Sequence, residues 1–541
     1  GGAGAALAAS ATGGVVLTNS GNDVPLIAGR AGGPATSFAY TATGGVTVGT
    51  VQGGGGIADV AGIVSTGAPI TLSVNGALAV NQGLTAPGAT VSLINAGAAP
   101  ISQTAAGTIT ANRLAIETGG PASLSDAASQ VQTVAATTVG GLAFRNATAT
   151  EVAARNTGSG AIAITGQDSL TIGSDALLGL TGVQNLAGAV TLDAAATLLV
   201  NEAVSATTTA TLRGMPVVVN DTVGAPNVNV AADLLSIDPL TGALGTAGLQ
   251  EAVLRTRTAG RAISLGAIAA GELSIDANQL DRIGVGAPSY HLRIGSVGGT
   301  LRPGEDATGT LTIRSIADFS GRALTLEAGT AGAAVTQQPG AAVFAGSLIA
   351  HSAQGSVLLG RANNIADALA GAALGATSDF EFLGSGNVTL GSLAHGTDPA
   401  VAGITAGRTA RLASVFGTVQ QTAAAPVTAQ NLLARSDLGA VNLAAAANSV
   451  GTLAGDARTG FRYRAADGLT IGAIGPSVAF PGPADGIAIT SAGAPVTLIA
   501  GGDLALAAPI TAGDGTVRLQ AGQDLTQTAA AAVTADALLA R

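Results

Sequence analysis

The amino-acid sequence predicts an all-β fold, a parallel β-helix (β-solenoid) in which short strands coil around one narrow core. Three observations support this prediction: a repeat of about 21 residues near the C-terminal end, an alternation of aliphatic and polar residues in the repeated strands, and a composition of small residues. At roughly 21–25 residues per turn, the 541 residues would give about 22–26 turns. Stacked at ~4.8 Å, these turns would form a rod on the order of 100–125 Å long.

The repeat is clearest in residues 493–541. Val496 and Leu498 recur 21 residues later as Val517 and Leu519, and the strands and turns that follow them return in the same order. A chain that comes back to the same strands after each step of this length is most simply a stack of coils. Each coil then contacts only the coils before and after it.

Within each coil the strands alternate, as in Val496-Thr497-Leu498, with aliphatic side chains on one side and polar ones on the other. Pairs such as Asn75-Gly76 and Gly502-Asp503 lie between strands, where the chain must turn a corner. No helical period is sustained. Alanine-rich runs such as residues 366–376 have helix propensity, but they occupy the same phase as strand-like copies elsewhere.

The composition excludes several other classes of protein. Charged residues are 10% of the chain, aromatic residues are 2%, and Cys and Trp are absent. The 47% of hydrophobic residues can bury a core, so the chain is not expected to be disordered. All 22 basic residues are Arg and the net charge is −10, so no basic stripe is available to bind nucleic acid. No run of about 18 apolar residues predicts a transmembrane segment.

Two landmarks divide the chain into about five long units. One is a Gln motif, as in Val419-Gln420-Gln421-Thr422, and the other is an Asn followed two residues later by an aliphatic residue. Some intervals between landmarks differ by 21 residues, which is one coil, while those of 57 and 92 residues are expected to contain irregular loops. We therefore expect one continuous solenoid over residues 1–541, with no separate globular domain. The Gln motif marks its units at Gln103, Asp221, Gln337, Gln421 and Gln527.

The polar landmarks are candidate corner or ladder positions. Amide side chains can stack as ladders between strands. Copies of the Asn landmark lie about a hundred residues apart, however, several turns from one another, so bonds to local backbone groups are the preferred interpretation. These positions are Asn22, Asn278, Asn363, Asn448, Gln103, Gln337, Gln421 and Gln527, with a diverged copy of the Asn landmark at Ser129.

Eight of the twelve aromatic residues share roughly one phase of the long unit. They can form a platform for glycans or for a neighbouring molecule, or they can fill wide places in the core, which is the more ordinary role of aromatic residues. The eight are Phe38, Tyr40, Phe144, Tyr290, Phe380, Phe382, Phe461 and Tyr463.

No catalytic residue, cofactor or metal site is predicted, and the chain is not expected to be an enzyme. The densest charged set is Arg302 with Glu305 and Asp306, in a turn flanked by Gly and Pro that we expect to be a solvated loop. The three histidines are isolated in the sequence and lack the spacing of metal-binding motifs. They are His291, His351 and His395.

Residues 501–541, together with the run AANSVGTLAG at 446–455, resemble the shaft repeats of filamentous-haemagglutinin-like exoproteins. These are large Gram-negative surface adhesins exported by two-partner secretion. The resemblance implies a right-handed parallel β-helix, a hand that also agrees with the rule for parallel crossover connections. It further implies an extracellular or cell-surface location, associated with the outer membrane, and no Asn-Pro-Asn motif of the family's secretion domain is found here.

The favoured function is a structural or adhesive extracellular rod, the repetitive shaft of a large surface or secreted fibre protein that assembles into filaments or sheets. The expected partners are other copies of the chain, end to end or laterally, and host or matrix glycans. One alternative is a polysaccharide lyase or hydrolase, which needs converging carboxylates. Another is a surface-binding or ice-binding solenoid. Because the chain begins without Met and stops in mid-pattern, it is expected to be a piece of something longer.

Overall fold

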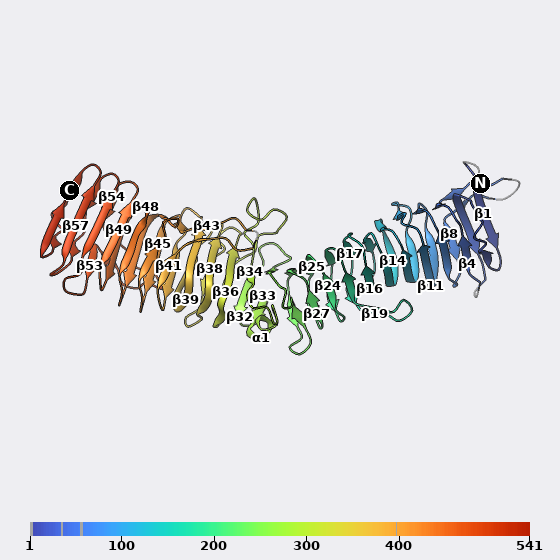
Figure 1. The fold of residues 1–541 in the computed structure, drawn as a ribbon, viewed down its shortest axis with the longest axis horizontal. Coiled ribbons are helices and arrows are strands. Elements are labelled where there is room, and N and C mark those ends of the chain that lie inside the picture. Colours follow the sequence, from blue (N-terminus) through green and yellow to red (C-terminus); the bar gives the residue numbers. More distant parts are fainter. Residues whose placement is uncertain (1–3, 34–35, 55–57, 397) are drawn as a thin grey trace. The chain divides into compact units, whose positions relative to one another are not determined.

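The computed structural model describes residues 4–33, 36–54, 58–396 and 398–541. Nearly all of its elements are β-strands, and strands of successive coils pair in parallel as a β-solenoid of about 25 turns (Figure 1). The predicted fold class is confirmed, with a turn number inside the predicted range. One helix is present in the described part, the single turn α1 (Ala277–Leu280).

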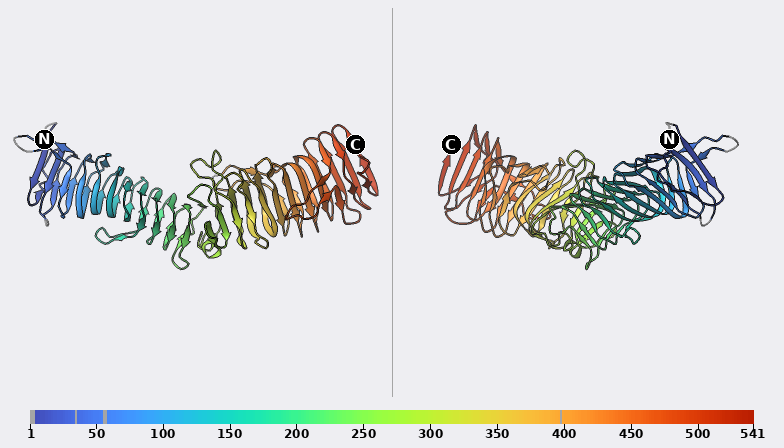
Figure 2. Two further views of the ribbon diagram at one scale, coloured as in Figure 1. Left: turned by 180° about the vertical axis from the view of Figure 1, so that it is seen from behind. Right: turned by 45° about the vertical axis from the view of Figure 1, so that its right-hand side comes forward.

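The chain divides into two compact units. The first contains residues 1–252 and 281–288, and the second contains residues 253–280 and 289–541. In each unit the strands of consecutive coils lie side by side (Figure 2). Each unit is therefore a stack of coils with its own core.

The register of the strands reproduces the sequence repeat. Strand β54 (Val496–Ala500) pairs in parallel with β57 (Thr516–Ala521), and Val496 lies opposite Val517. The 21-residue step is therefore the offset between hydrogen-bonded neighbours in adjacent coils. A one-residue slip would turn every aliphatic side chain from the core to the surface, so the alternation in the sequence sets this register.

The core is a column of aliphatic side chains from alternate strand positions. In β9 (Ile70–Val74), Ile70 and Leu72 are fully buried while Thr71 between them is partly exposed. Full burial of each such side chain stabilises the folded state by roughly 1.5–3 kcal/mol. Every coil adds several of them, and its backbone amides and carbonyls bond to the coils on either side.

In the described part of the chain, four short antiparallel hairpins, which we call arms 1 to 4, interrupt the coils. Arms 1 and 2 belong to the first unit and arms 3 and 4 to the second. Each arm packs on a strand of the solenoid: β3 (Leu26–Ala31), β16 (Thr150–Asn156), β39 (Val357–Ala373) and β48 (Val441–Ala457), respectively. These strands are therefore buried on both faces over several consecutive residues. In order, the arms are β6–β7 (Thr50–Val51 and Val60–Ala61), β19–β20 (Ser174–Asp175 and Leu180–Thr181), β42–β43 (Ser392–Leu393 and Val401–Ala402) and β51–β52 (Ala473–Ile474 and Ala484–Asp485).

A glycine with positive φ ends each arm. In arm 3 this is Gly403, with φ of 61°, whose N–H donates to the carbonyl of Gly391 at 2.9 Å and so closes the base of the hairpin. A Cβ at Gly403 would lie 1.9 Å from the carbonyl oxygen of Pro426 in the next coil. Glycine is required here both by the left-handed backbone and by the lack of space. The equivalent residues in arms 1, 2 and 4 are Gly62, Gly182 and Gly486.

Candidate functional site

The Gln and Asn landmarks form hydrogen-bonded pairs between neighbouring coils. The side-chain Nε2 of Gln421 donates to Oδ1 of Asn448 at 2.8 Å and to the carbonyl of Ala425 at 2.8 Å. Asn448, which is fully buried, donates to the carbonyls of Leu443 and Arg464. The pair satisfies local backbone carbonyls, and it also joins two coils through a bond between side chains, which was not predicted from the sequence.

Two of the Asn positions taken from the sequence need correction. Gln337 bonds to Asn364 at 2.6 Å, and Asn364 is fully buried while Asn363 is exposed. The equivalent of Asn448 is therefore Asn364, because a shift of one residue along a strand changes the face of the side chain. Asn278 is exposed on helix α1 and does not occupy a strand corner.

The remaining landmarks keep parts of the same arrangement. Gln103 bonds to the hydroxyl of Ser129 at 3.3 Å and to the carbonyl four residues ahead. Gln527 makes the same four-residue bond, and Asn22 donates to the carbonyl five residues before it, as Asn448 does. Asp221 accepts a bond from the adjacent amide of Thr222. All of these side chains bond to backbone or neighbouring polar groups, which is a structural role.

The eight aromatic residues of the proposed platform lie inside the solenoid. Their relative exposure ranges from 0% to 4%, with Tyr290 the most exposed of them. A ring without an exposed face cannot stack on a sugar or on another molecule. These rings therefore fill the core and do not form a glycan platform.

A cluster of charged side chains lies on the outer face of the second unit. Arg293 comes from β34 (His291–Ile294) and Glu327 from β36 (Ala317–Ala328). In β36 the alternate residues Leu324 and Leu326 point into the core, so Glu327 points outward. The other members are Arg302 and Glu305, from the loop that follows β34, and Asp398, from arm 3.

Two arginines hold this cluster together. Arg293 bonds to Glu305 at 2.6 Å and lies 3.4 Å from Glu327. Arg302 bonds to Glu327 at 2.5 Å and makes two bonds to Asp398, one of them at 2.8 Å. Burial acts to raise the pKa of Glu305, but the hydrogen bond and positive charge of Arg293 outweigh it, and the pKa is lowered.

The solvated loop expected around Arg302 is therefore wrong for two of its three residues. The side chains of Arg302 and Glu305 are only 11% and 20% exposed, and both are ion-paired, whereas Asp306 is exposed. Their partners Glu327 and Asp398 are distant in sequence, so the pairing leaves no local signal. The signal that was available is the charge within apolar strands, at Arg293 between Leu292 and Ile294 and at Glu327 between Leu326 and Ala328.

Arginine side chains also bond arms 2 and 4 to the sheet beneath them. In the first unit Arg113 makes two bonds to Asp175 of arm 2, at 2.8 and 2.9 Å, and this bonding lowers the pKa of Asp175. In the second unit Arg411 donates to the carbonyl of Gly475 and Arg435 to that of Pro483, both in arm 4. The planar guanidinium can bond to two groups at once, which suits it to this role.

Two of the three histidines meet beneath arm 3. His291 Nε2 lies 2.9 Å from the hydroxyl of Thr325, which lies 3.0 Å from Nδ1 of His395. His395 Nε2 lies 2.8 Å from the hydroxyl of Ser347, and the two imidazole rings are 5.0 Å apart. Burial, aided by the charge of His291, lowers the pKa of His395 to about 4, so it is neutral at pH 7.

Ser347 and His395 have the separation of a nucleophile and its general base. A base with so low a pKa is a weak proton acceptor, and its second nitrogen meets the hydroxyl of Thr325 where catalytic triads place a carboxylate. The pair is better suited to attaching arm 3 to β38 (Val343–Ser352) than to catalysis.

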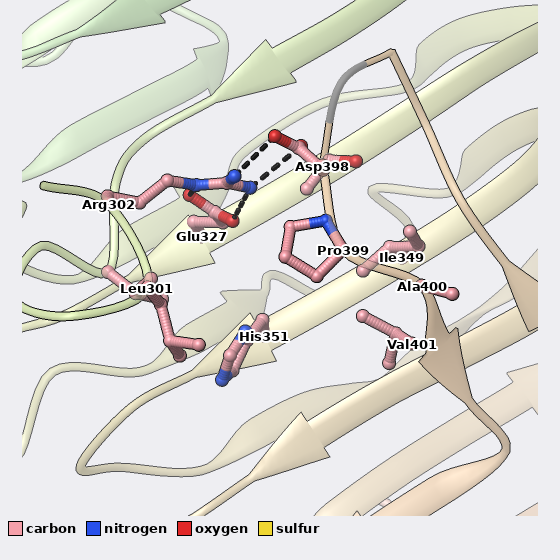
Figure 3. A pocket seen from close by; sticks show the side chains of 11 residues that line it. Leu301, Arg302, Glu327, Ile349, His351, Asp398, Pro399, Ala400 and Val401 are labelled. Atoms are coloured by element: carbon pink, nitrogen blue, oxygen red, sulfur yellow. Dashed lines mark hydrogen bonds and ion pairs between the residues drawn. The ribbon is translucent and has the colours of Figure 1, made fainter.

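A cavity of about 120 Å³ lies next to the ion pairs of Arg302 (Figure 3). Its walls are mostly apolar, with one imidazole among them, that of His351. His351 is 9% exposed and burial lowers its pKa, so it too is neutral at pH 7. Its Nε2 is buried and has no hydrogen-bond partner. The lining residues are Val297, Leu301, Arg302, Thr325, Glu327, Ile349, His351, Asp398, Pro399, Ala400 and Val401.

A second depression, of about 490 Å³, lies beside arm 4 and contains two acids and two arginines. Asp379 bonds to Arg408 at 2.7 Å and to Arg411 at 2.9 Å, and Arg411 also bonds to Glu381 at 3.2 Å. Burial raises the pKa of Glu381. Burial acts in the same direction on Asp379, but the bonds from both arginines outweigh it and lower its pKa.

The fold and the recurring amide pairs define the class of this molecule as a repetitive β-solenoid protein. Comparisons with protein-family models, with curated proteins and with solved structures found no match to the chain. Among the described residues, no helix has the length and apolar character needed to span a membrane.

Proposed function

We propose that the chain is part of the shaft of a large extracellular or cell-surface fibre protein, with a structural and adhesive role. The observation that carries this proposal is the return of one coil along both units, in which a buried Gln side chain bonds to Ser129 in the first unit and to Asn364 or Asn448 in the second. Arms are also present in both units. What recurs is a set of contacts that hold coils together. The resemblance to filamentous-haemagglutinin-like shafts and the parallel solenoid support the same function.

The arms are the surfaces by which we propose that copies associate laterally. Leu177 in arm 2 and Val478 in arm 4 are 78% and 79% exposed. At the tips of projecting arms these aliphatic side chains are accessible to the surface of another copy, where their burial would be favourable. The same exposed side chains could also bind a different molecule, as an adhesive role requires. The assembly experiment below distinguishes that role from self-association.

Electron microscopy and sedimentation of the purified chain test this function. We expect filaments or lateral sheets at high protein concentration, and we expect Leu177→Asp with Val478→Asp to reduce them. Leu240→Asp is the matched control, because Leu240 is 85% exposed but lies outside the arms. Single particles at every concentration, unchanged by the arm variants, would refute lateral assembly.

A polysaccharide-acting enzyme is the second candidate, favoured by the depression beside arm 4. Asp379 and Glu381 share Arg411 as a partner, yet their pKa values are shifted in opposite directions, as in acid and base pairs of glycosidases. Release of products from polyuronates or neutral glucans, abolished by both Asp379→Asn and Glu381→Gln, would favour this candidate over a purely structural role.

A further inference from the structure

We propose that the depression beside arm 4 binds one acidic sugar residue of a polysaccharide, a uronate whose carboxylate is held by Arg408. This inference rests on the adhesive part of the proposed function and names the class of glycan that is bound. The depression lies wholly within the second unit, between β39, β45 (Thr409–Ser414) and arm 4. Its volume of about 490 Å³ falls within the range of about 300–1,000 Å³ that is usual for small-molecule sites.

Arg408 has hydrogen-bond donors that the protein does not use. Its Nε donates to Oδ1 of Asp379 at 2.8 Å and its Nη2 donates to Oδ2 at 2.7 Å, which occupies one edge of the guanidinium. An arginine has five N–H donors, and Nη1 of Arg408 has no partner among the residues that the structure describes. The side chain lines the depression and is 53% exposed, so its second edge can donate two parallel bonds to a carboxylate.

The acids around Arg408 neutralise it only in part. Its acidic partner Asp379 also bonds to Arg411 at 2.9 Å, so one carboxylate is shared by two guanidiniums. Among the ion pairs of the described residues, Glu381 bonds to Arg411 and not to Arg408. Positive charge therefore remains at the exposed edge of Arg408, where it attracts an anion and repels a cation.

The rest of the lining suits a sugar ring. Leu358, Pro476 and Val478 offer apolar contacts to the C–H groups of the ring. Ser356 accepts a bond from the backbone N–H of Asp379 at 3.1 Å and keeps its own hydrogen for a ligand oxygen. Because Pro476 and Val478 lie at the exposed tip of arm 4, further sugars can continue outward from the bound residue. A fatty acid fits less well, since its long apolar chain would lie against two acids and two arginines.

Calorimetric titration of the full chain at pH 7 and low salt tests the site, with trigalacturonate, with the neutral trisaccharide maltotriose and with inorganic phosphate. We expect trigalacturonate to bind at least about tenfold more tightly than maltotriose, because a charge-assisted bidentate contact is added. Arg408→Gln should remove this difference. Glu381→Gln removes a negative charge beside Arg411 and should tighten binding about threefold, which a loss of structure would not do. Arg464→Gln is the matched control, since Arg464 is exposed on β49 (Phe461–Ala465) and does not line the depression.

Saturable binding of trigalacturonate that weakens in Arg408→Gln at an unchanged melting temperature, and not in Arg464→Gln, supports the proposal. Absence of saturable binding, equal affinity for maltotriose or for phosphate, an equal loss in both arginine variants, or weaker binding in Glu381→Gln overturns it. Binding without release of sugar products supports recognition of the uronate and contradicts the enzymatic candidate. Binding is measured on single chains, so it can hold while lateral assembly fails, and it can fail while filaments form.

Discussion

The side-chain amide of Gln421 donates a 2.8 Å hydrogen bond to Oδ1 of Asn448, 27 residues later and one coil further along the solenoid. The same interval separates Gln337 from Asn364, which are bonded at 2.6 Å. Removing one partner of a buried amide pair lowers the free energy of unfolding by more than the net contribution of the hydrogen bond, because the remaining polar group is buried without a partner and without water. These pairs therefore couple the stability of one coil to that of the next.

Replacement of Asn364 should test this coupling against an adjacent control. We expect Asn364→Ala to lower the free energy of unfolding by about 1–3 kcal/mol, because Gln337 and nearby backbone groups lose a buried partner. Asn363→Ala, on the exposed face of the same strand, should change it by less than about 0.5 kcal/mol. Urea unfolding followed by circular dichroism measures both, and equal effects would show that the assigned register is wrong.

Gly403→Ala should loosen arm 3. The left-handed backbone alone costs a residue with a Cβ roughly 1–2 kcal/mol, and the added atom would also collide with the carbonyl of Pro426. We expect faster hydrogen exchange of residues 391–403 by mass spectrometry. Gly386→Ala is the control, since a Cβ added at Gly386 would have no other atom within 4 Å. Unchanged exchange in Gly403→Ala would mean that the arm base relaxes without cost.

Removal of Arg302 should destabilise the second unit far more than removal of Arg408. Arg302→Gln leaves Asp398 and the buried Glu327 with lost partners, and breaking a buried pair from one side costs about 3–5 kcal/mol. The Arg408 side chain is 53% exposed, so Arg408→Gln should cost at most about 1 kcal/mol. Urea unfolding of the two variants compares them. Similar decreases in the free energy of unfolding would contradict the prediction that the more buried Arg302 contributes more to stability than Arg408.

The hydroxyl of Tyr463 is buried without a partner, and burial raises the pKa of this residue. Tyr463→Phe removes the unsatisfied group and keeps the ring, so we expect stability to be unchanged or to rise by about 1 kcal/mol. In Tyr40 the hydroxyl bonds to the carbonyl of Val24, and Tyr40→Phe should be neutral or destabilising. Thermal unfolding of both variants distinguishes these cases, and a clear loss in Tyr463→Phe would reveal a partner for its hydroxyl.

The attachment of arm 3 should weaken in mild acid. The pKa of His395 is lowered from 6.5 to about 4 by folding, so the unfolded chain binds a proton first as the pH falls. Above pH 6.5 His395 is neutral in both the folded and the unfolded chain and does not lower the free energy of unfolding. Between pH 6.5 and about 4 the unfolded chain is protonated first, and the free energy of unfolding falls by up to about 3 kcal/mol. The polar and titratable groups next to the His395 imidazole are Thr325, Ser347, His291 and Asp398.

Hydrogen exchange of residues 391–403 at pH 7 and pH 5, corrected for intrinsic rates, measures this effect. We expect acid to increase exchange in arm 3 and to leave arm 4, residues 473–485, nearly unchanged. His395→Asn should remove the dependence on pH in this window. Equal acid sensitivity in the variant would assign the effect to another group.

The arms show why part of the structure was not predicted. Their lengths and tip sequences differ, so they do not appear as a repeat. Irregular loops were expected only in the intervals of 57 and 92 residues between landmarks. Arm 2 does lie in the interval of 92 residues, but arms 3 and 4 lie in intervals whose lengths appeared regular. A glycine such as Gly403 is not distinctive in a chain with 80 glycines, although its role depends on the contact with Pro426 in another coil.

The sequence by itself determined the coil, its step and its core, because each coil packs only on its neighbours and the same alternation is repeated in each, as in Val496 and Val517. The tertiary structure decided which residue of the pair Asn363 and Asn364 is buried, since register depends on pairing with another coil. It also decided the contact between Arg302 and Asp398. These residues lie 96 positions apart, and only the stacking of coils beneath arm 3 brings them together.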